Sequence, residues 1–339
     1  MPETQYRIFN RPESFAEGWY WALRSDELRR GKTARIKLLG RELALYRGLD
    51  GKVRALDAYC PHMGAHLAEG CVEGAKLRCL FHNWRFDGNG RCDEVPALGG
   101  APNFDARTAS WPVEEKYGLI WVWTGPEPRH PVPFVPELGT GDCAYALGNR
   151  FVKNCHPSVV MINAIDAQHF NSVHALPVRL DMEAVAVNEN CVTFSNTTRV
   201  PETSWFTRLI KPFYKNALTY SMCYWYGSTG SVTIGPDFLH FHIIFALRLT
   251  EDGQTEGRTI LVTKRRDGLF GKLFNSVLLF LTKIVGNFFA KGDTLIFRSI
   301  KFDLKTPIAA DRAITRFIAH LEGQRAGWQE VALRPKVSA

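Results

Sequence analysis

The sequence predicts an α+β protein of two domains, and three observations lead to this prediction. Short strand-like runs separated by Gly- and Asp-containing turns fill the first 125 residues, as in a small antiparallel β-domain. The stretch 125–133 is rich in proline and suits an extended linker. Longer strand-like runs follow it, with helical patterns before and after them. We therefore expect one domain over residues 1–133 and a second over residues 134–339.

The strands of the first domain are expected where apolar and β-branched side chains cluster between turns. The clearest runs lie at 34–39, 43–47 and 119–123, with turn signals at 49–52 and 87–90. Short runs joined by tight turns are typical of antiparallel pairing. The first domain is therefore expected to be a small antiparallel β-structure.

The second domain is expected to have its strands in the middle and its helices at the ends. Residues 159–174 fit a helix that starts with a group of apolar residues. At 269–289, apolar residues recur at helical spacing, and a last helix is expected at 309–320. The expected strands are 191–200, 218–226, 238–249 and 258–264.

Composition and charge exclude several classes of protein. The 339 residues are 45% hydrophobic and include 22 Phe, 10 Tyr and 9 Trp, which excludes intrinsic disorder. Basic residues exceed acidic ones by 42 − 34 = 8. The densest basic run is only Lys264-Arg265-Arg266, so we expect no nucleic-acid partner. A mild positive excess suits an acidic protein partner instead.

The N-terminus and the cysteines indicate a reducing compartment. Residues 1–7 contain no basic segment leading into an apolar run, so we expect no secretory signal and a cytoplasmic location. In that compartment the eight cysteines are expected to be thiols or metal ligands rather than disulfides.

Two Cys–His pairs form the strongest local pattern. Cys60-Pro61-His62 is followed by Cys79-Leu80-Phe81-His82, so two loops can bring two thiolates and two imidazoles around one point. Zinc takes the same ligand types, but its paired ligands are usually separated by two to four residues, and only Pro61 separates the first pair here. The spacing C-x-H…C-x-x-H instead matches a Rieske [2Fe–2S] cluster, in which cysteines hold one iron and histidines the other. We predict that Cys60, His62, Cys79 and His82 bind such a cluster.

A second group of candidate ligands begins within residues 163–174. His169 and His174 are five positions apart, which suits a helix with a loosened turn at its end, and Asp166 precedes His169 by one turn. Two histidines and one carboxylate with open positions are the ligands of a non-haem Fe(II) that activates O₂. Asp166 is too close to join both histidines, so we expect Asp293 as the third ligand, on the helix after the long apolar one. Because Gly-Asp-Thr is also ordinary capping chemistry, a helix cap is the alternative role for Asp293.

With both motifs present, the chain resembles the Rieske non-haem iron oxygenases, the terminal oxygenase components of multicomponent systems. The order of features agrees along nearly the whole chain: cluster loops, linker, N-x-x-D-x-x-H-x-x-x-x-H from Asn163 to His174, then a distant aspartate. The segments 60–64 and 79–84 look especially like the branch of bacterial 3-ketosteroid 9α-hydroxylase oxygenases and cholesterol 7-desaturases. Gly292 is a departure, because many members have an acidic residue before the ligand aspartate.

The resemblance implies a β-sandwich Rieske domain, a helix-grip catalytic domain around a twisted antiparallel sheet, and a head-to-tail homotrimer. In that trimer, His82 of the partner subunit would pass an electron through Asp166 to His169. Asn163 matches a family position that lies beside the ligands and is not one of them. Electrons from NAD(P)H would arrive through a separate ferredoxin or reductase, since no G-x-G-x-x-G fingerprint in strand–helix context is present.

The implied reaction is hydroxylation, oxidative demethylation or desaturation of a hydrophobic, polycyclic, sterol- or steroid-like molecule. Two alternatives are desaturation or oxidative ring closure in specialised metabolism, and a Rieske electron carrier without oxygenase activity. The segment 269–289 has lysines beside an aromatic apolar face, and its uncharged run 273–282 is too short to span a bilayer. A core helix, an entrance lid and an interfacial helix at the inner membrane are the three alternatives for this segment.

Overall fold

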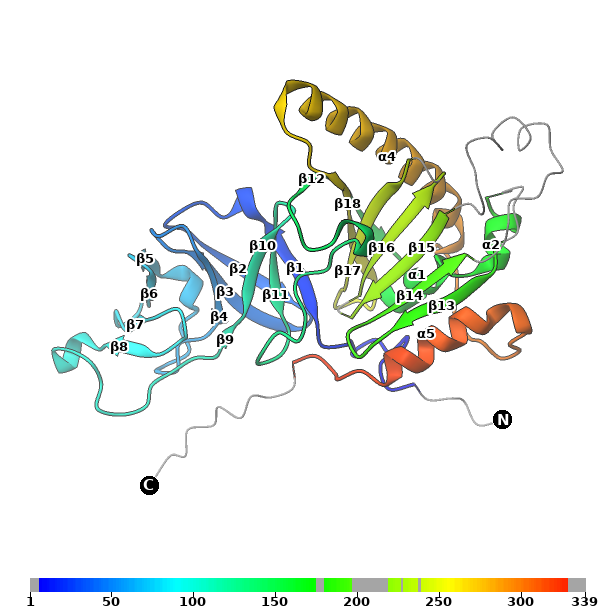
Figure 1. Ribbon diagram of the computed structural model, residues 1–339. Helices are drawn as coiled ribbons and strands as arrows, with labels where there is room; N and C mark the ends of the chain where they lie inside the picture. The colour runs from blue at the N-terminus through cyan, green and yellow to red at the C-terminus, as the bar shows by residue number, and fades with distance from the viewer. Residues whose placement is uncertain (1–5, 175–179, 197–218, 227, 237–238, 329–339) are drawn as a thin grey trace. The chain divides into compact units, whose positions relative to one another are not determined.

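The structure is a computed structural model that describes residues 6–174, 180–196, 219–226, 228–236 and 239–328 (Figure 1). The chain forms two compact units. In the described chain, the N-terminal unit comprises residues 17–132 and 327–328, and the C-terminal unit comprises residues 6–16 and 133–326.

The N-terminal unit consists of three small antiparallel sheets around a tryptophan-rich core. Strands expected at 34–39, 43–47 and 119–123 are confirmed as β2 (Thr33–Leu38), β3 (Arg41–Arg47) and β11 (Leu119–Trp123). Trp19, Trp121 and Trp123 are fully buried. The sheets are β1 (Trp19–Arg24), β11 (Leu119–Trp123) and β10 (Val113–Lys116); β2 (Thr33–Leu38), β3 (Arg41–Arg47), β4 (Val53–Asp57) and β9 (Ser110–Trp111); and β5 (Cys71–Glu73), β6 (Lys76–Arg78), β7 (Arg85–Phe86) and β8 (Cys92–Glu94).

The C-terminal unit is built on one antiparallel sheet with helices packed against it. In order across the sheet, the strands are β12 (Cys143–Lys153), β18 (Thr255–Lys264), β17 (Phe241–Leu249), β16 (Thr229–Gly235), β15 (Thr219–Trp225), β14 (Cys191–Asn196) and β13 (Met182–Val187). The α-helices among the described residues are α1 (Pro157–Asn163), α2 (Ala167–Ser172), α4 (Gly268–Ile296) and α5 (Arg312–Glu322). α4 packs against β12, β17 and β18, and α5 packs against β13 and β14. The predicted α+β fold is confirmed.

Several expected strands of this unit are present with different ends, and three strands were not expected. β14, β15 and β17 fall within the expected ranges, of which residues 197–200, 218 and 238 lie outside the described residues. β18 begins earlier than expected, at Thr255. The sequence pattern did not indicate β12, β13 or β16. β16 contains Gly230 and Gly235, and glycine has low strand propensity, so this strand does not stand out in the sequence.

The single helix expected at 159–174 is wrong, because the chain breaks between α1 and α2. The Asp166 carboxylate accepts hydrogen bonds from the backbone N–H groups of Gln168 (2.9 Å) and His169 (3.3 Å), and so starts α2 as its N-cap. The Tyr220 hydroxyl donates to the Ala164 carbonyl at 2.9 Å, which satisfies the end of α1. The break therefore places Asp166 at the start of a short helix.

The long apolar segment forms one continuous helix, α4, from Gly268 to Ile296. Asp293 lies inside this helix near its C-terminal end. Both the expectation that Asp293 lies on a following helix and the alternative that it caps one are therefore wrong. Gly268, the first residue of the helix, has a positive φ, and the helix has no interruption before Ile296, so the Gly-Asp-Thr sequence lies within its last five residues.

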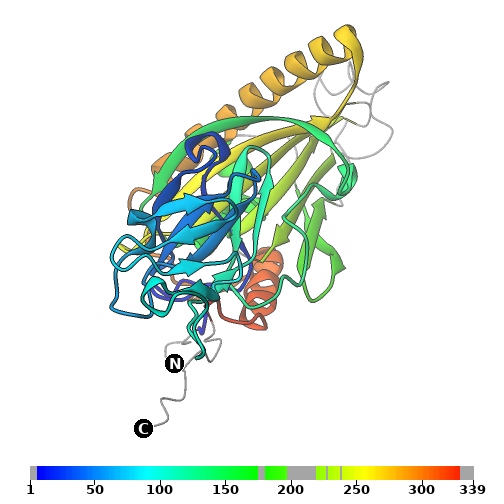
Figure 2. The same cartoon turned by 90° about the vertical axis from the view of Figure 1, so that its left-hand side faces the viewer.

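α4 exposes most of its large apolar side chains, and two of the three residues that it buries most deeply are polar. Asn275, Leu278 and Thr282 are buried. In Figures 1 and 2 the N-terminal turns of α4 extend past the ends of the strands. A core helix has the opposite arrangement, so the core-helix interpretation is wrong for this face. The exposed residues are Leu269, Phe270, Leu273, Phe274, Val277, Phe280, Leu281, Ile284 and Phe288.

The two ends of the described chain pack differently from the expected domain division. Backbone N–H groups of Ile8 (2.9 Å) and Phe9 (2.7 Å) donate to the Glu322 carboxylate on α5, so the N-terminal segment packs with the C-terminal unit. The indole N–H of Trp328 donates to the Leu39 carbonyl at 3.1 Å within the N-terminal unit. Each end of the described chain is thus held by the unit that is farther from it in sequence.

Candidate metal centres

Two loops of the N-terminal unit have the same backbone geometry. The N–H of Cys60 donates to the Ala65 carbonyl (2.9 Å), and the N–H of Gly64 donates to the Cys60 carbonyl (2.9 Å). The N–H of Cys79 likewise donates to the Trp84 carbonyl (2.8 Å), and that of Asn83 donates to the Cys79 carbonyl (3.1 Å). The fifth residue of each loop, Gly64 or Asn83, has a positive φ, which glycine and asparagine tolerate best.

These loops bury the two cysteines and expose the two histidines. Cys60 is 4% exposed and Cys79 is 1% exposed, whereas His62 and His82 are exposed. The two imidazole rings contact each other with centroids 4.5 Å apart, and the His62 ring stacks on Trp84 at 4.5 Å. The side chains therefore form a thiol pair on the inside and an imidazole pair at the surface.

The chemistry of this group fits an iron–sulfur cluster. The thiols of Cys60 and Cys79 share a hydrogen bond, and burial raises the pKa of Cys60 to about 11. Two adjacent buried thiols ionise only with a strong positive charge beside them, and cluster iron supplies such a charge. Exposed imidazole ligands would leave the histidine edge open to an electron donor or acceptor.

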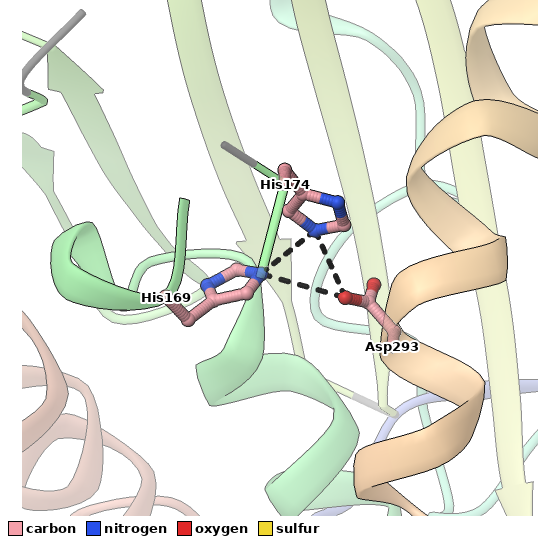
Figure 3. Close-up of side chains that lie close together, drawn as sticks. All are labelled: His169, His174 and Asp293. Carbon is pink, nitrogen blue, oxygen red and sulfur yellow. Dashed lines mark hydrogen bonds and ion pairs between the residues drawn. The ribbon is translucent and has the colours of Figure 1, made fainter. Parts of the chain in front are cut away.

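In the C-terminal unit, His169 on α2, His174 just after α2 and Asp293 on α4 come together (Figure 3). Nε2 of His169 lies 3.1 Å from Nε2 of His174. Oδ1 of Asp293 lies 3.0 Å from Nε2 of His174 and 3.5 Å from Nε2 of His169. Both histidines are buried. Three potential ligand atoms thus face one point, as a facial two-histidine, one-carboxylate site requires.

The hydrogen bonds around this group leave its inner atoms available to a metal. Nδ1 of His169 lies 2.9 Å from the Asp166 carbonyl, which can only accept, so Nδ1 is the donor and the neutral ring has its lone pair on Nε2. Burial lowers the pKa of His174, opposed by the charge of Asp293, which favours a neutral ligand. Oδ1 of Asp293 is buried without a hydrogen bond of regular geometry. A cation between the three side chains would satisfy all of these atoms.

Gly292 allows α4 to approach the histidines closely. A Cβ atom at this position would lie 3.0 Å from Cγ1 of Val173 and 3.1 Å from Cε1 of His174. The family's acidic side chain would therefore not fit at Gly292 without moving the His174 ring. The departure noted in the sequence has a packing reason in this chain.

Asn163 and Asp166 contact His169 from two sides. Nδ2 of Asn163 lies 3.3 Å from Nε2 of His169, on the side of the ring that faces the candidate metal. The main chain of Asp166 holds Nδ1, and its side chain caps α2. The role of these two residues in electron transfer or metal positioning is a proposal that the geometry supports.

A cavity of about 260 Å³ opens beside the three side chains. Most of its wall is apolar, and Lys153 is a polar side chain close to the metal group. The sequence pattern gave no indication of these residues, because they come from strands and a helix that are far apart in the chain. The wall includes Phe170, Tyr220, Val232, Ile243, Phe245, Leu261, Phe289 and Phe297.

Comparison with known proteins first identifies the class of protein to which this chain is similar. Residues 18–105 match the Rieske [2Fe–2S] domain family, so the N-terminal unit is a Rieske domain with a [2Fe–2S] cluster as its cofactor. The terminal oxygenase of carbazole 1,9a-dioxygenase from Novosphingobium sp. KA1 has the same fold over 95% of this chain and 96% of its own, with a TM-score of 0.70 and 18% identity. The resemblance to the Rieske non-haem iron oxygenases is confirmed.

Among proteins with similar sequences are enzymes named for sterols and steroids. The chain is 38% identical over 167 residues to cholesterol 7-desaturase nvd 1 of Ciona intestinalis, covering 48% of this chain and 35% of the relative. It is 37% identical over 169 residues to a probable 3-ketosteroid-9-alpha-monooxygenase oxygenase component of Rhodococcus rhodochrous, covering 48% of this chain and 42% of the relative. The chain thus spans less than half the length of these curated relatives.

Proposed function

We propose that the chain is a terminal oxygenase that uses O₂ and electrons to hydroxylate, demethylate or desaturate a hydrophobic polycyclic substrate. The convergence of His169, His174 and Asp293 on one apolar cavity, in a chain with a Rieske domain, is the observation that carries this proposal. The named relatives act on cholesterol and 3-ketosteroids, which supports a sterol- or steroid-like substrate.

The three side chains would hold a ferrous ion, with positions left open on the cavity side. Such an ion supplies O₂ activation. The chain's own residues fix the His169 tautomer, keep His174 neutral and exclude water from the reacting carbon through the apolar wall. A Rieske electron carrier would not need this arrangement, so the carrier alternative is disfavoured.

Electrons would enter at the exposed histidine edge from a ferredoxin or reductase that takes them from NAD(P)H. Apolar side chains next to this edge, Met63, Leu80 and Phe81, are exposed and suit a transient redox contact. The net charge of +8 favours an acidic donor. Turnover that does not change with ionic strength would contradict electrostatic steering.

We also propose a head-to-tail homotrimer, in which Asp166 connects His82 of the partner subunit to His169. The Asp166 side chain lies at the start of α2, and its main-chain carbonyl already holds the ring that would receive the electron. Light scattering on the purified chain should give three times the chain mass of 38.3 kDa.

A substrate panel tests the oxygenase proposal. Sterols, 3-ketosteroids and polycyclic aromatic compounds would be tested with reductase, NADH and the iron-loaded chain, with O₂ uptake and oxidised product measured together. The proposal predicts substrate-dependent O₂ uptake with a hydroxylated, demethylated or desaturated product. Ring-closed products would favour the specialised-metabolism alternative, and reduction of the cluster without O₂ uptake for any compound would favour the carrier.

The exposed face of α4 supports a location in the cytoplasm at the surface of the inner membrane. Leu269 is 82% exposed and Phe270 is 86% exposed. Lys264 and Lys272 lie exposed near them and complement anionic lipid headgroups. Each large apolar side chain moved out of water contributes about 1.5–3 kcal/mol. An apolar face with basic residues beside it is typical of a helix that lies in the membrane interface.

A bilayer-spanning role does not fit the same helix. By length and composition alone, α4 could cross a membrane, despite the short uncharged run. Its C-terminal half, however, carries Asp293 and lines the cavity, and the helix packs on three strands. Charged ligand residues and sheet contacts are incompatible with a lipid environment all round. We therefore propose contact through the outward face only.

Flotation with vesicles tests this contact. The chain should float with vesicles that contain phosphatidylglycerol and less with pure phosphatidylcholine. Phe270→Glu should abolish flotation, and Leu49→Glu, at a 53% exposed leucine in a turn of the other unit, should not. A wild-type chain that stays with the soluble fraction in every case would overturn the proposal, as would a light-scattering result in which Phe270→Glu dissociates an oligomer without affecting flotation.

A further inference from the structure

Lys153 is a cation inside the apolar cavity. It is the last residue of β12, is half-buried, and lines the cavity together with the three candidate ligands. Its ammonium donates to the Thr294 hydroxyl at 2.7 Å. Thr294 follows Asp293 directly on α4, so Lys153 is held beside the metal group by a contact that the helix itself fixes.

The surroundings of Lys153 provide no compensating negative charge at contact distance. Among the described residues, no carboxylate oxygen lies within the 4.0 Å of an ion pair from its Nζ. The rings of Phe151 and Phe297 lie near it, with centroids 5.7 and 5.6 Å from Nζ, and the charge of Asp293 acts on it only from beyond contact distance. The Thr294 hydroxyl donates its own proton to the Ala290 carbonyl at 2.8 Å, so it offers Lys153 only a neutral acceptor.

The net charge of the iron-loaded site also favours a negatively charged group beside Lys153. A divalent metal ion with the Asp293 carboxylate has a net charge of +1, and the ammonium adds another positive charge in a mainly apolar cavity. Lysine at such a position is costly unless a negatively charged partner is present. Two N–H groups of the ammonium remain for a bound molecule, since only one is used by Thr294.

We propose that Lys153 binds an anionic oxygen of the substrate, so that the preferred substrate is a polycyclic molecule with a carboxylate or a similar acidic group at the end nearest the metal. This inference rests on the proposed oxygenase function and narrows its substrate class. A charge-assisted hydrogen bond of this kind favours the acid over a neutral analogue by about tenfold or more.

Matched pairs of ligands test the proposal by isothermal titration calorimetry on the iron-loaded full chain. The probes are 2-naphthoic acid and 5β-cholanic acid, each beside its methyl ester. The wild-type chain should bind one or both acids at least about tenfold more tightly than the esters. Lys153→Met should remove this difference. Lys283→Met, at the exposed lysine that lines the same cavity from α4, should keep it.

Two results would overturn the proposal. Acids that bind no more tightly than their esters to the wild-type chain would contradict it, and so would a preference for the acids that survives in Lys153→Met. Iron content is measured in every variant, because a Lys153→Met chain that loses its mononuclear iron would show that the lysine serves the metal group and not the substrate. Failure of the oxygenase proposal would give a different result. No compound would then cause O₂ uptake, whether or not the acids bind more tightly than their esters.

Discussion

The Cys–His loops take their shape from their own backbone, whereas His169, His174 and Asp293 meet only where the segment 169–174 approaches α4. Each loop is closed by a pair of hydrogen bonds between residues at most five positions apart. The second group depends on the helix break at Asp166, on the close approach at Gly292 and on the burial of both histidines. The first centre is therefore a local structure, and the second is a product of the tertiary fold.

The comparison predicts that the two centres can be emptied separately, which is the largest effect we expect. Asp293→Ala removes one of three ligands from the second centre, so iron should fall from about three to about two per chain, and turnover should be lost. Cys79→Ser should leave about one iron per chain, because the cluster is lost as a unit. Iron and acid-labile sulfide analysis measures both. Loss of the cluster in Asp293→Ala would show that the centres are not independent.

Asp166→Asn should separate electron delivery from structure. Asparagine also caps helices, so α2 and both metal centres should remain, and the melting temperature should change little. Turnover should fall about 100-fold or more if the carboxylate connects the two centres across the proposed trimer. Activity within twofold of the wild type would sink this role for Asp166. The control is metal content, which must equal that of the wild type.

Gly292→Ala should weaken only the packing-dependent centre. The added Cβ meets the Val173 and His174 side chains, and overpacking of this kind costs about 1–3 kcal/mol. Dialysis against a chelator should therefore remove the mononuclear iron faster, while the cluster spectrum stays unchanged. Gly286→Ala on the same helix is the matched control, because its Cβ would meet only the flexible tip of Ile243. Equal iron retention in both variants would contradict the packing argument.

Acid stability gives the smallest expected difference. Burial lowers the pKa of His156, in the C-terminal unit, to about 4, below its ordinary value of 6.5. Between pH 6.5 and about 4, His156 binds a proton in the unfolded chain but not in the folded chain. The stabilising contribution is therefore complete above pH 6.5 and is lost as the pH falls toward 4. The melting temperature of His156→Gln should fall less steeply than that of the wild type over this window. Parallel curves would show that His156 does not contribute.

The Cys–His centre could be predicted from the sequence more completely than the centre of His169, His174 and Asp293. The loops at Cys60 and Cys79 are recognisable because ligand identity and spacing lie within one short segment each. His169 and His174 could be paired for the same reason. Asp293 could be proposed only because Asp166 is too close to join both histidines, and its helix was assigned incorrectly, because nothing in Gly-Asp-Thr distinguishes the interior of a helix from its start.

The cavity could not be predicted, because its wall comes from strands and helices throughout the C-terminal unit. Lys153 ends a strand that the pattern did not indicate, and Tyr220 lies on another element of the sheet. The orientation of α4 was equally inaccessible. Apolar residues recur at helical spacing on its exposed face, and only packing shows that Asn275 and Thr282 face inward instead.

Metal analysis of the anaerobically purified wild-type chain tests our proposal that it holds two separate iron centres. We expect about three irons and two acid-labile sulfides per chain, with a Rieske EPR signal on reduction and a separate mononuclear ferrous signal after addition of nitric oxide. Two irons per chain, with no nitric-oxide signal after reconstitution with ferrous iron, would contradict it.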